Sequence, residues 1–322
     1  MKIIKILAAF SALLLIQGGA AAATSFSALY TFGDSLSDVG NSDNAAMSLY
    51  KTLGFCDPAH FCPPYDNGRL SNGPVASQYL AGALFQSGLT PANFRSYAFA
   101  GANSGDSNFG FDPGGLLHLP GMKQEVNNYL EDAKGKADPN ALYMVWGGAN
   151  DYLSGDPATV AAQNIAGYVG TLAGAGARHI LVPNLPDLSL TPFGHKDGTP
   201  AQNFSLTFDS ALNADLNQIG QQHPGVDIFR FDTFALLNDV VQHPDKYGFT
   251  DTGDPCLTTL IPCGNPDQQV WWDDFHPTTR AHQVIGLAFA AAVPEPEITS
   301  MFIAGLAILG FIAKRRRGLQ SL

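Results

Sequence analysis

Charged residues are scarce in this chain of 322 residues, at 14% of the sequence against about 25% in an average soluble protein. The hydrophobic fraction is 45%, which excludes an intrinsically disordered polyelectrolyte. Basic residues are scarcer than acidic ones, 17 against 28, so the net charge is −11. Because a nucleic-acid binder needs a basic surface, we expect no nucleic-acid partner.

Several motifs of metal and nucleotide chemistry are also missing. The sequence has no His-Glu-x-x-His, EF-hand loop, P-loop or Cys-x-x-Cys. Among the eight histidines, His276 and His282 are the nearest to a metal-spaced pair, at six positions apart. Asp251, Asp254 and Asp267 lie in a loop rich in glycine and proline, where solvated turn residues are expected rather than a calcium site. We therefore expect neither a metal nor a cofactor.

The four cysteines fall into two close pairs, Cys56 with Cys62 and Cys256 with Cys263. Four cysteines allow three disulfide connectivities, and we expect the two local ones because each pair closes a short, proline-containing loop. Each bridge should stabilise the fold by on the order of 2–3 kcal/mol. Disulfides in turn indicate an exported protein.

Residues 1–23 have the pattern of a secretory signal peptide. Lys2 and Lys5 precede an apolar run over 6–16, and the alanines at 20–23 offer a cleavage site. The alternative is a buried N-terminal helix.

Residues 293–322 contain Pro294-Glu295-Pro296, an apolar stretch over 298–313 and a basic cluster over 314–317. Together these parts resemble the PEP-CTERM sorting signal of Gram-negative bacteria. That resemblance implies processing by an exosortase, transient anchoring in the inner membrane through the apolar helix, and delivery to the cell surface or extracellular matrix. The alternative is a plain C-terminal membrane anchor. Without both terminal segments, 11 basic and 26 acidic residues remain, a net charge of −15.

The region 24–292 alternates apolar strand patterns with helical ones, which predicts one α/β domain around a parallel sheet. No internal repeat or linker divides it. In such sheets ligands bind beyond the carboxyl ends of the strands. The predicted strands are 28–32, 95–99, 141–146, 180–182 and 226–231, and the predicted helices are 73–84, 121–132, 157–175, 205–222 and 278–292.

Ser35 follows the first predicted strand, in the sequence Gly33-Asp34-Ser35-Leu36. A serine hydroxyl becomes a nucleophile when a base removes its proton. The alternative is an ordinary turn in which Ser35 caps the next helix.

His276 is the candidate base because Asp273 precedes it by three residues. In a tight turn this carboxylate reaches the imidazole Nδ1 and leaves Nε2 free to face a serine. Asp274 is the rival partner of His276, although it should point to another side of the turn.

Two loops after predicted strands offer donors for an oxyanion. Gly101 has a backbone N–H to present, and Asn150 has a side-chain amide. Each residue alone is equally compatible with a turn or a cap.

These blocks together resemble the GDSL, or SGNH, hydrolase family over nearly all of residues 28–290. The first block is the segment 32–41 with Ser35, followed by the segment ending in Gly101, then Gly148-Ala149-Asn150-Asp151, and finally Asp-x-x-His at 273–276. The resemblance implies a three-layer α/β/α flavodoxin-like fold with a central parallel sheet. It also implies a catalytic triad of Ser35, His276 and Asp273, with Ser35 N–H, Gly101 N–H and the Asn150 amide as oxyanion donors. Gly73, in the stretch 69–73, is the alternative to Gly101 as the backbone oxyanion donor. We interpret that stretch as structural.

The sequence is also similar to the lipase-like branch of that family. Tyr65, Phe109, Phe111 and Trp146 are candidates for lining an acyl pocket, and the alternative is core or loop packing. We therefore expect an exported serine carboxylic-ester hydrolase whose substrate is a lipid or an acylated glycan. The alternatives are an O-acetylesterase acting on exopolysaccharide and a non-catalytic surface or matrix binding protein.

Overall fold

The computed structural model describes residues 26–41, 65–110, 119–258 and 261–293. Residues Phe26–Val293 pack as one unit. The predicted signal peptide, the predicted sorting signal from residue 294 onward, the pair Cys56 and Cys62, and Phe111 lie outside the described residues. No helix in the described ranges is long and apolar enough to cross a membrane.

The centre of the unit is a sheet of five parallel strands in the order β2-β1-β3-β4-β5. This is the flavodoxin-type doubly wound order, in which the crevice at the carboxyl ends of the strands holds the ligand. β1 lies between β2 and β3, so its carboxyl end opens in the middle of that crevice. The strands are β1 Leu29–Gly33, β2 Phe94–Ser96, β3 Leu142–Trp146, β4 His179–Pro183 and β5 Asp227–Phe231.

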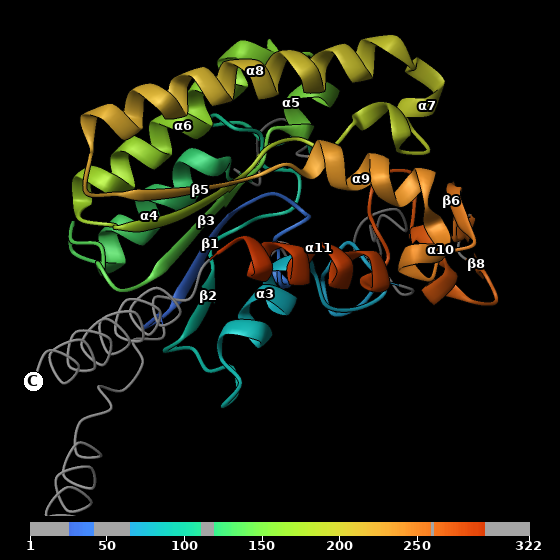
Figure 1. Cartoon of the computed structure of the whole chain (residues 1–322), viewed down its shortest axis with the longest axis horizontal. Coiled ribbons are helices and arrows are strands. Elements are labelled where there is room, and N and C mark those ends of the chain that lie inside the picture. Colours follow the sequence, from blue (N-terminus) through green and yellow to red (C-terminus); the bar gives the residue numbers. More distant parts are fainter. Residues whose placement is uncertain (1–25, 42–64, 111–118, 259–260, 294–322) are drawn as a thin grey trace, which may run out of the picture. The chain divides into compact units, whose positions relative to one another are not determined.

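Helices cover both faces of the sheet, as Figure 1 shows. Strand side chains alternate between two cores. Tyr143 and Val145 of β3 face α4, α6 and α8, while Leu142 and Met144 face α3 and α11. The prediction of three α/β/α layers around a parallel sheet is therefore confirmed. The covering helices are α3 Ala76–Leu84, α4 Met122–Asp132, α6 Ala158–Ala175, α8 Thr199–Gln222 and α11 Thr279–Ala292.

The predicted strands and covering helices are all present, and three of their bounds differ from the prediction by more than one residue. β2 ends at Ser96 rather than at residue 99, because the chain turns into the loop that carries Gly101. α3 starts at Ala76 rather than at 73, because Val75 is its N-cap. α8 starts six residues earlier than predicted, at Thr199, with a proline in its first turn.

Several smaller elements were not predicted. β6 pairs with β9 in a second sheet, and β7 pairs with β8 in a hairpin. A disulfide joins Cys256 to Cys263 across that hairpin, with 4.8 Å between their Cα atoms. The elements are α5 Ala149–Ser154, η4 Leu188–Leu190, α7 Gly194–Asp197, α9 Thr233–Gln242, α10 Pro244–Tyr247, β6 Asp251–Pro255, β7 Leu257–Thr258, β8 Ile261–Pro262, η5 Pro266–Gln268 and β9 Gln269–Trp271.

Candidate active site

Ser35 lies in a tight turn directly after β1. The carbonyl of Asp34 accepts the N–H groups of Ser37 and Asp38, each at 3.0 Å, which folds the chain back at once. Gly33 makes this turn possible, because a Cβ at that position would lie 2.0 Å from the carbonyl oxygen of Trp146 on β3. Only glycine lets β1 end so close to its neighbour.

His276 places its imidazole between Ser35 and Asp273. Its Nε2 lies 2.9 Å from Ser35 Oγ. Its Nδ1 lies 2.9 Å and 2.8 Å from the two oxygens of Asp273. Ser35 and His276 are 241 positions apart in the chain and are both buried. The carboxylate, the imidazole and the hydroxyl thus form one continuous chain of polar contacts.

Asp273 is held by a tight turn after β9. Its Oδ1 accepts the backbone N–H groups of Phe275 at 2.8 Å and His276 at 2.7 Å. Burial raises the pKa of the Asp273 carboxyl, but the charge on His276 and the hydrogen bonds from His276, Phe275 and Tyr65 outweigh burial and leave the pKa below its ordinary value. The rival Asp274 faces outward, 3.8 Å from Lys196 Nζ. The structure therefore brings Asp273, not Asp274, to the imidazole.

Gly101 lies on the loop after β2 and Asn150 lies in the first turn of α5, just after β3, and both line the same cavity as Ser35 and His276. Gly101 has φ +77°, a left-handed conformation that suits glycine. Neither its N–H nor that of Ser35 has a hydrogen-bond partner among the described residues. Asn150 Nδ2 donates one hydrogen to the carbonyl of Ala102 at 3.0 Å, which leaves its second hydrogen for a ligand.

The cavity at these residues has a volume of about 350 Å³. Ser35, His276, Asn150 and Asp34 are among its polar lining residues, and most of its wall is aliphatic or aromatic. Trp146 and Phe109 line it as predicted from the sequence. An apolar cavity with a few convergent polar groups is the usual form of a small-molecule site.

The sequence model of the GDSL-like lipase/acylhydrolases matches residues 29–289. The chain belongs to this family. Two GDSL esterase/lipases of Arabidopsis thaliana are similar to it. At1g23500 is 26% identical over 301 residues, covering 80% of this chain and 87% of its own length. APG is 28% identical over 320 residues, covering 81% and 89%.

Among solved structures, a member of the lipolytic protein G-D-S-L family from Veillonella parvula aligns with a TM-score of 0.43 at 15% identity. The alignment covers 81% of this chain and 94% of that one. Membership of the GDSL-like family makes the present chain a hydrolase of ester bonds.

Tyr65 has a position in this GDSL chain that the sequence did not predict. It was expected to line an acyl pocket, but it is not among the cavity-lining residues. Its hydroxyl donates to Asp273 Oδ2 at 2.7 Å instead, and its ring packs edge-on against Trp272. The expected role was wrong because an amphipathic tyrosine packs its ring while its hydroxyl meets the buried carboxylate.

Two further buried carboxylates fix the loops around Ser35. Glu125 of α4 accepts the N–H of Gly33 at 2.8 Å and that of Phe99 at 3.1 Å, one on each oxygen. Asp38 accepts the N–H of Ala100 at 2.9 Å. Burial raises the pKa of Glu125 well above its ordinary value. The ends of β1 and β2 are thus fastened to each other through side chains.

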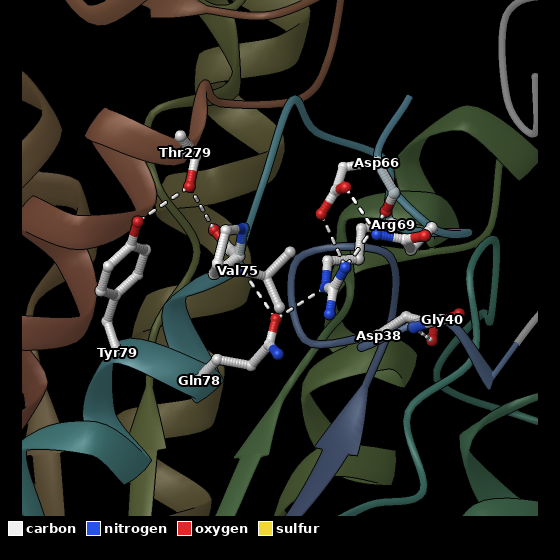
Figure 2. Close-up of polar contacts among 10 residues, drawn as sticks. Asp38, Gly40, Asp66, Arg69, Val75, Gln78, Tyr79 and Thr279 are labelled. Carbon is white, nitrogen blue, oxygen red and sulfur yellow. Dashed lines mark hydrogen bonds and ion pairs between the residues drawn. The ribbon is translucent and has the colours of Figure 1, made fainter. Parts of the chain in front are cut away.

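The stretch 69–73 lies beside the start of α3, as Figure 2 shows. The Arg69 guanidinium bonds Asp66 at 2.7 Å and Gln78 at 2.8 Å. Ser71 Oγ donates to the carbonyl of Pro277 at 2.9 Å, directly after His276. At the start of α11, Thr279 Oγ1 contacts the Tyr79 hydroxyl and the carbonyl of Pro74. This stretch therefore fastens the histidine loop, in agreement with a structural role.

Proposed function

We propose that this chain is an exported carboxylic-ester hydrolase that uses Ser35, His276 and Asp273 as a catalytic triad. The observation that carries the proposal is the unbroken series of contacts from Asp273 through His276 to Ser35 Oγ, at the base of an apolar cavity. A hydroxyl so placed has a base in contact and an orienting carboxylate behind that base.

In the first half of the reaction, Ser35 Oγ attacks the ester carbonyl and its proton passes to His276 Nε2. The resulting oxyanion accepts hydrogen bonds from the N–H groups of Ser35 and Gly101 and from the free hydrogen of Asn150. His276 then gives its proton to the departing alkoxide, and an acyl-enzyme remains on Ser35. Asp273 holds the ring in the tautomer that the exchange requires.

In the second half, His276 takes a proton from water while the water oxygen attacks the acyl carbonyl. Collapse of the second tetrahedral intermediate releases the carboxylic acid, and the proton returns to Ser35 Oγ. One water is consumed, and one acid and one alcohol are formed.

The direct test compares the wild type with Ser35→Ala in hydrolysis of p-nitrophenyl esters. Loss of the nucleophile should lower kcat by about 10⁴-fold or more while the far-UV circular dichroism stays the same. Ser87→Ala, an exposed serine after α3, is the matched control and should keep full activity. Covalent labelling by a fluorophosphonate should occur on Ser35 in the wild type only. An unlabelled wild type would favour a non-catalytic binding protein.

Export is a separate part of the proposal and rests on the two terminal patterns at 1–23 and 293–322. Intact-mass measurement of protein recovered from the producing cells should show loss of the first segment. Loss of the second near Pro294-Glu295-Pro296 would support exosortase processing. A mass that retains both segments would contradict the proposed route to the cell surface or matrix.

A further inference from the structure

The cavity continues beyond the catalytic groups into a space between α9, β9 and α11. We call this space the distal chamber. Cavity residues from these three elements belong to a hydrophobic cluster separate from the two cores of the sheet, and they join the wall that holds Ser35 and His276. Figure 1 shows α9 and α11 on the same side of the molecule. The chamber is lined by Leu236, Leu237, Val240, Val270, Ala281 and Val284.

The distal chamber offers a ligand almost no polar contacts. Trp271 lines it, but its Nε1 already donates to the carbonyl of Thr252 at 2.9 Å. The hydroxyl of Thr233, which also lines the cavity, is already bonded to Asn184. A sugar ring placed there would lose its hydrogen bonds to water without replacement, whereas an alkyl chain would lose nothing.

The volume also fits a chain. A methylene takes roughly the ~30 Å³ that a water molecule occupies in the liquid, so the whole cavity of about 350 Å³, from Ser35 through the distal chamber, accommodates at most on the order of ten methylenes. An acetyl group would leave most of this apolar space without contacts.

Ser35 and the residues of the distal chamber line one cavity, so a group attached to Ser35 shares its space with the chamber. Leu36 and Ile285 line the cavity together with Ser35, and the acyl group becomes attached to Ser35 Oγ during the reaction. The alcohol, in contrast, leaves after the first step.

We propose, on the basis of the function proposed above, that the distal chamber binds the acyl chain and makes this enzyme a hydrolase of medium-chain fatty-acyl esters rather than of acetyl esters. The residues that set the chain length are then Leu237 on α9 and Val284 on α11, because they face the chamber from two sides.

The test is a series of p-nitrophenyl esters from acetate through hexanoate and decanoate to palmitate. Each buried methylene should raise kcat/KM roughly twofold or more, on the order of a hundredfold from acetate to decanoate, and the rise should end there. A parallel series of acetate esters with lengthening alcohols should stay flat. A flat acyl series, or a rise in the alcohol series instead, would overturn the assignment.

Substitutions locate the effect. Val284→Trp fills the chamber and should lower kcat/KM for decanoate at least tenfold while acetate hydrolysis changes by less than twofold. Leu287→Trp on the same helix is the matched control, because Leu287 is 50% exposed, and it should change neither rate. Leu237→Ala enlarges the chamber and should move the acyl chain length of highest kcat/KM to longer acids. It takes the place of Val284→Trp if that variant does not fold. Equal losses on acetate and decanoate would refute the proposal.

Binding separates this inference from the proposed function. Calorimetry measures the binding of decanoic acid to the Ser35→Ala variant, in which no reaction takes place. Adding Val284→Trp to this variant should abolish the heat of binding. If no ester is hydrolysed but decanoic acid binds in this way, the triad proposal fails and the chamber stands. Suppose instead that esters are hydrolysed, but Ser35→Ala either does not bind decanoic acid or still binds it when Val284→Trp is added. The chamber proposal then fails while the triad proposal stands.

Discussion

Asp34, the residue before the proposed nucleophile Ser35, is expected to destabilise the folded chain at neutral pH. Its side chain is buried, and Oδ1 accepts the N–H of Leu36 at 3.0 Å. Oδ2 has no hydrogen-bond partner among the described residues. Burial raises the pKa of Asp34 from 3.8 to about 6, against the opposing effects of the Leu36 N–H and the charge on His276.

The sign of the pH dependence follows from proton binding. Between pH 3.8 and about 6 the folded state binds more protons at Asp34 than the unfolded state does, so the free energy of unfolding falls as pH rises through this range. Above it the penalty is constant. A difference of two pKa units corresponds to ~3 kcal/mol. Asp34→Asn removes this titration, so its stability relative to the wild type should rise by ~3 kcal/mol between pH 4 and pH 7.

Urea unfolding at four pH values between 4 and 7 measures the effect. The difference between variant and wild type is the readout, because other carboxyls with a raised pKa, such as Glu125 and Asp209, contribute equally to both curves. Asp267→Asn, at an exposed carboxylate, controls for the loss of one negative charge. Parallel curves for the wild type and Asp34→Asn, within about 0.5 kcal/mol, would refute the reasoning. At pH 7 the variant should be the more stable but slower enzyme, because the charge of Asp34 favours the His276 imidazolium formed during the reaction.

Two further predictions concern the groups around the triad. Tyr65→Phe removes a hydrogen bond to the charged Asp273, so urea unfolding at pH 7 should show a loss of ~1.5–3 kcal/mol. The loss should shrink as pH falls through the depressed pKa of Asp273, and a loss that stays constant down to the lowest pH at which the fold persists would contradict the assigned partner. Asn150→Ala should lower kcat by about 10²–10³-fold with little change in KM, and steady-state kinetics with an unchanged kcat would remove Asn150 from the oxyanion site.

The strands and layers were predictable because each buried strand carries its own signal. Residues 142–146 are apolar at every position, as a strand with both faces covered must be. The elements within 233–242 and 251–271 were missed for different reasons. Residues 233–242 carry the helical period at Leu237, Val240 and Val241, and this signal was overlooked. The strands within 251–271 are only two to five residues long, too short to show an alternating pattern.

The candidate site was predictable to a different degree for each group. Ser35 and His276 stand out because their residue types and their neighbours suit the same chemistry. Glu125 was missed, although it lies on the apolar face of its helix with Met122, Val126 and Tyr129, and an acid in that register signals a buried partner. Tyr65 was missed as a partner of Asp273 because nothing local connects residues 208 positions apart.

The two halves of the site are positioned by different means, which has a consequence for substitutions. Ser35, Gly101 and Asn150 follow three adjacent strands, so the pairing of β2, β1 and β3 places them, and the carboxylates of Glu125 and Asp38 fasten the loops after β1 and β2. His276 follows the short strand β9 of the second sheet, and its position depends on contacts with the segment 65–75. Substitutions in the segment 65–75 should therefore separate the His276 imidazole from Ser35, while the proposed oxyanion donors stay in place. Residues that never touch the substrate thus determine whether the nucleophile has a base.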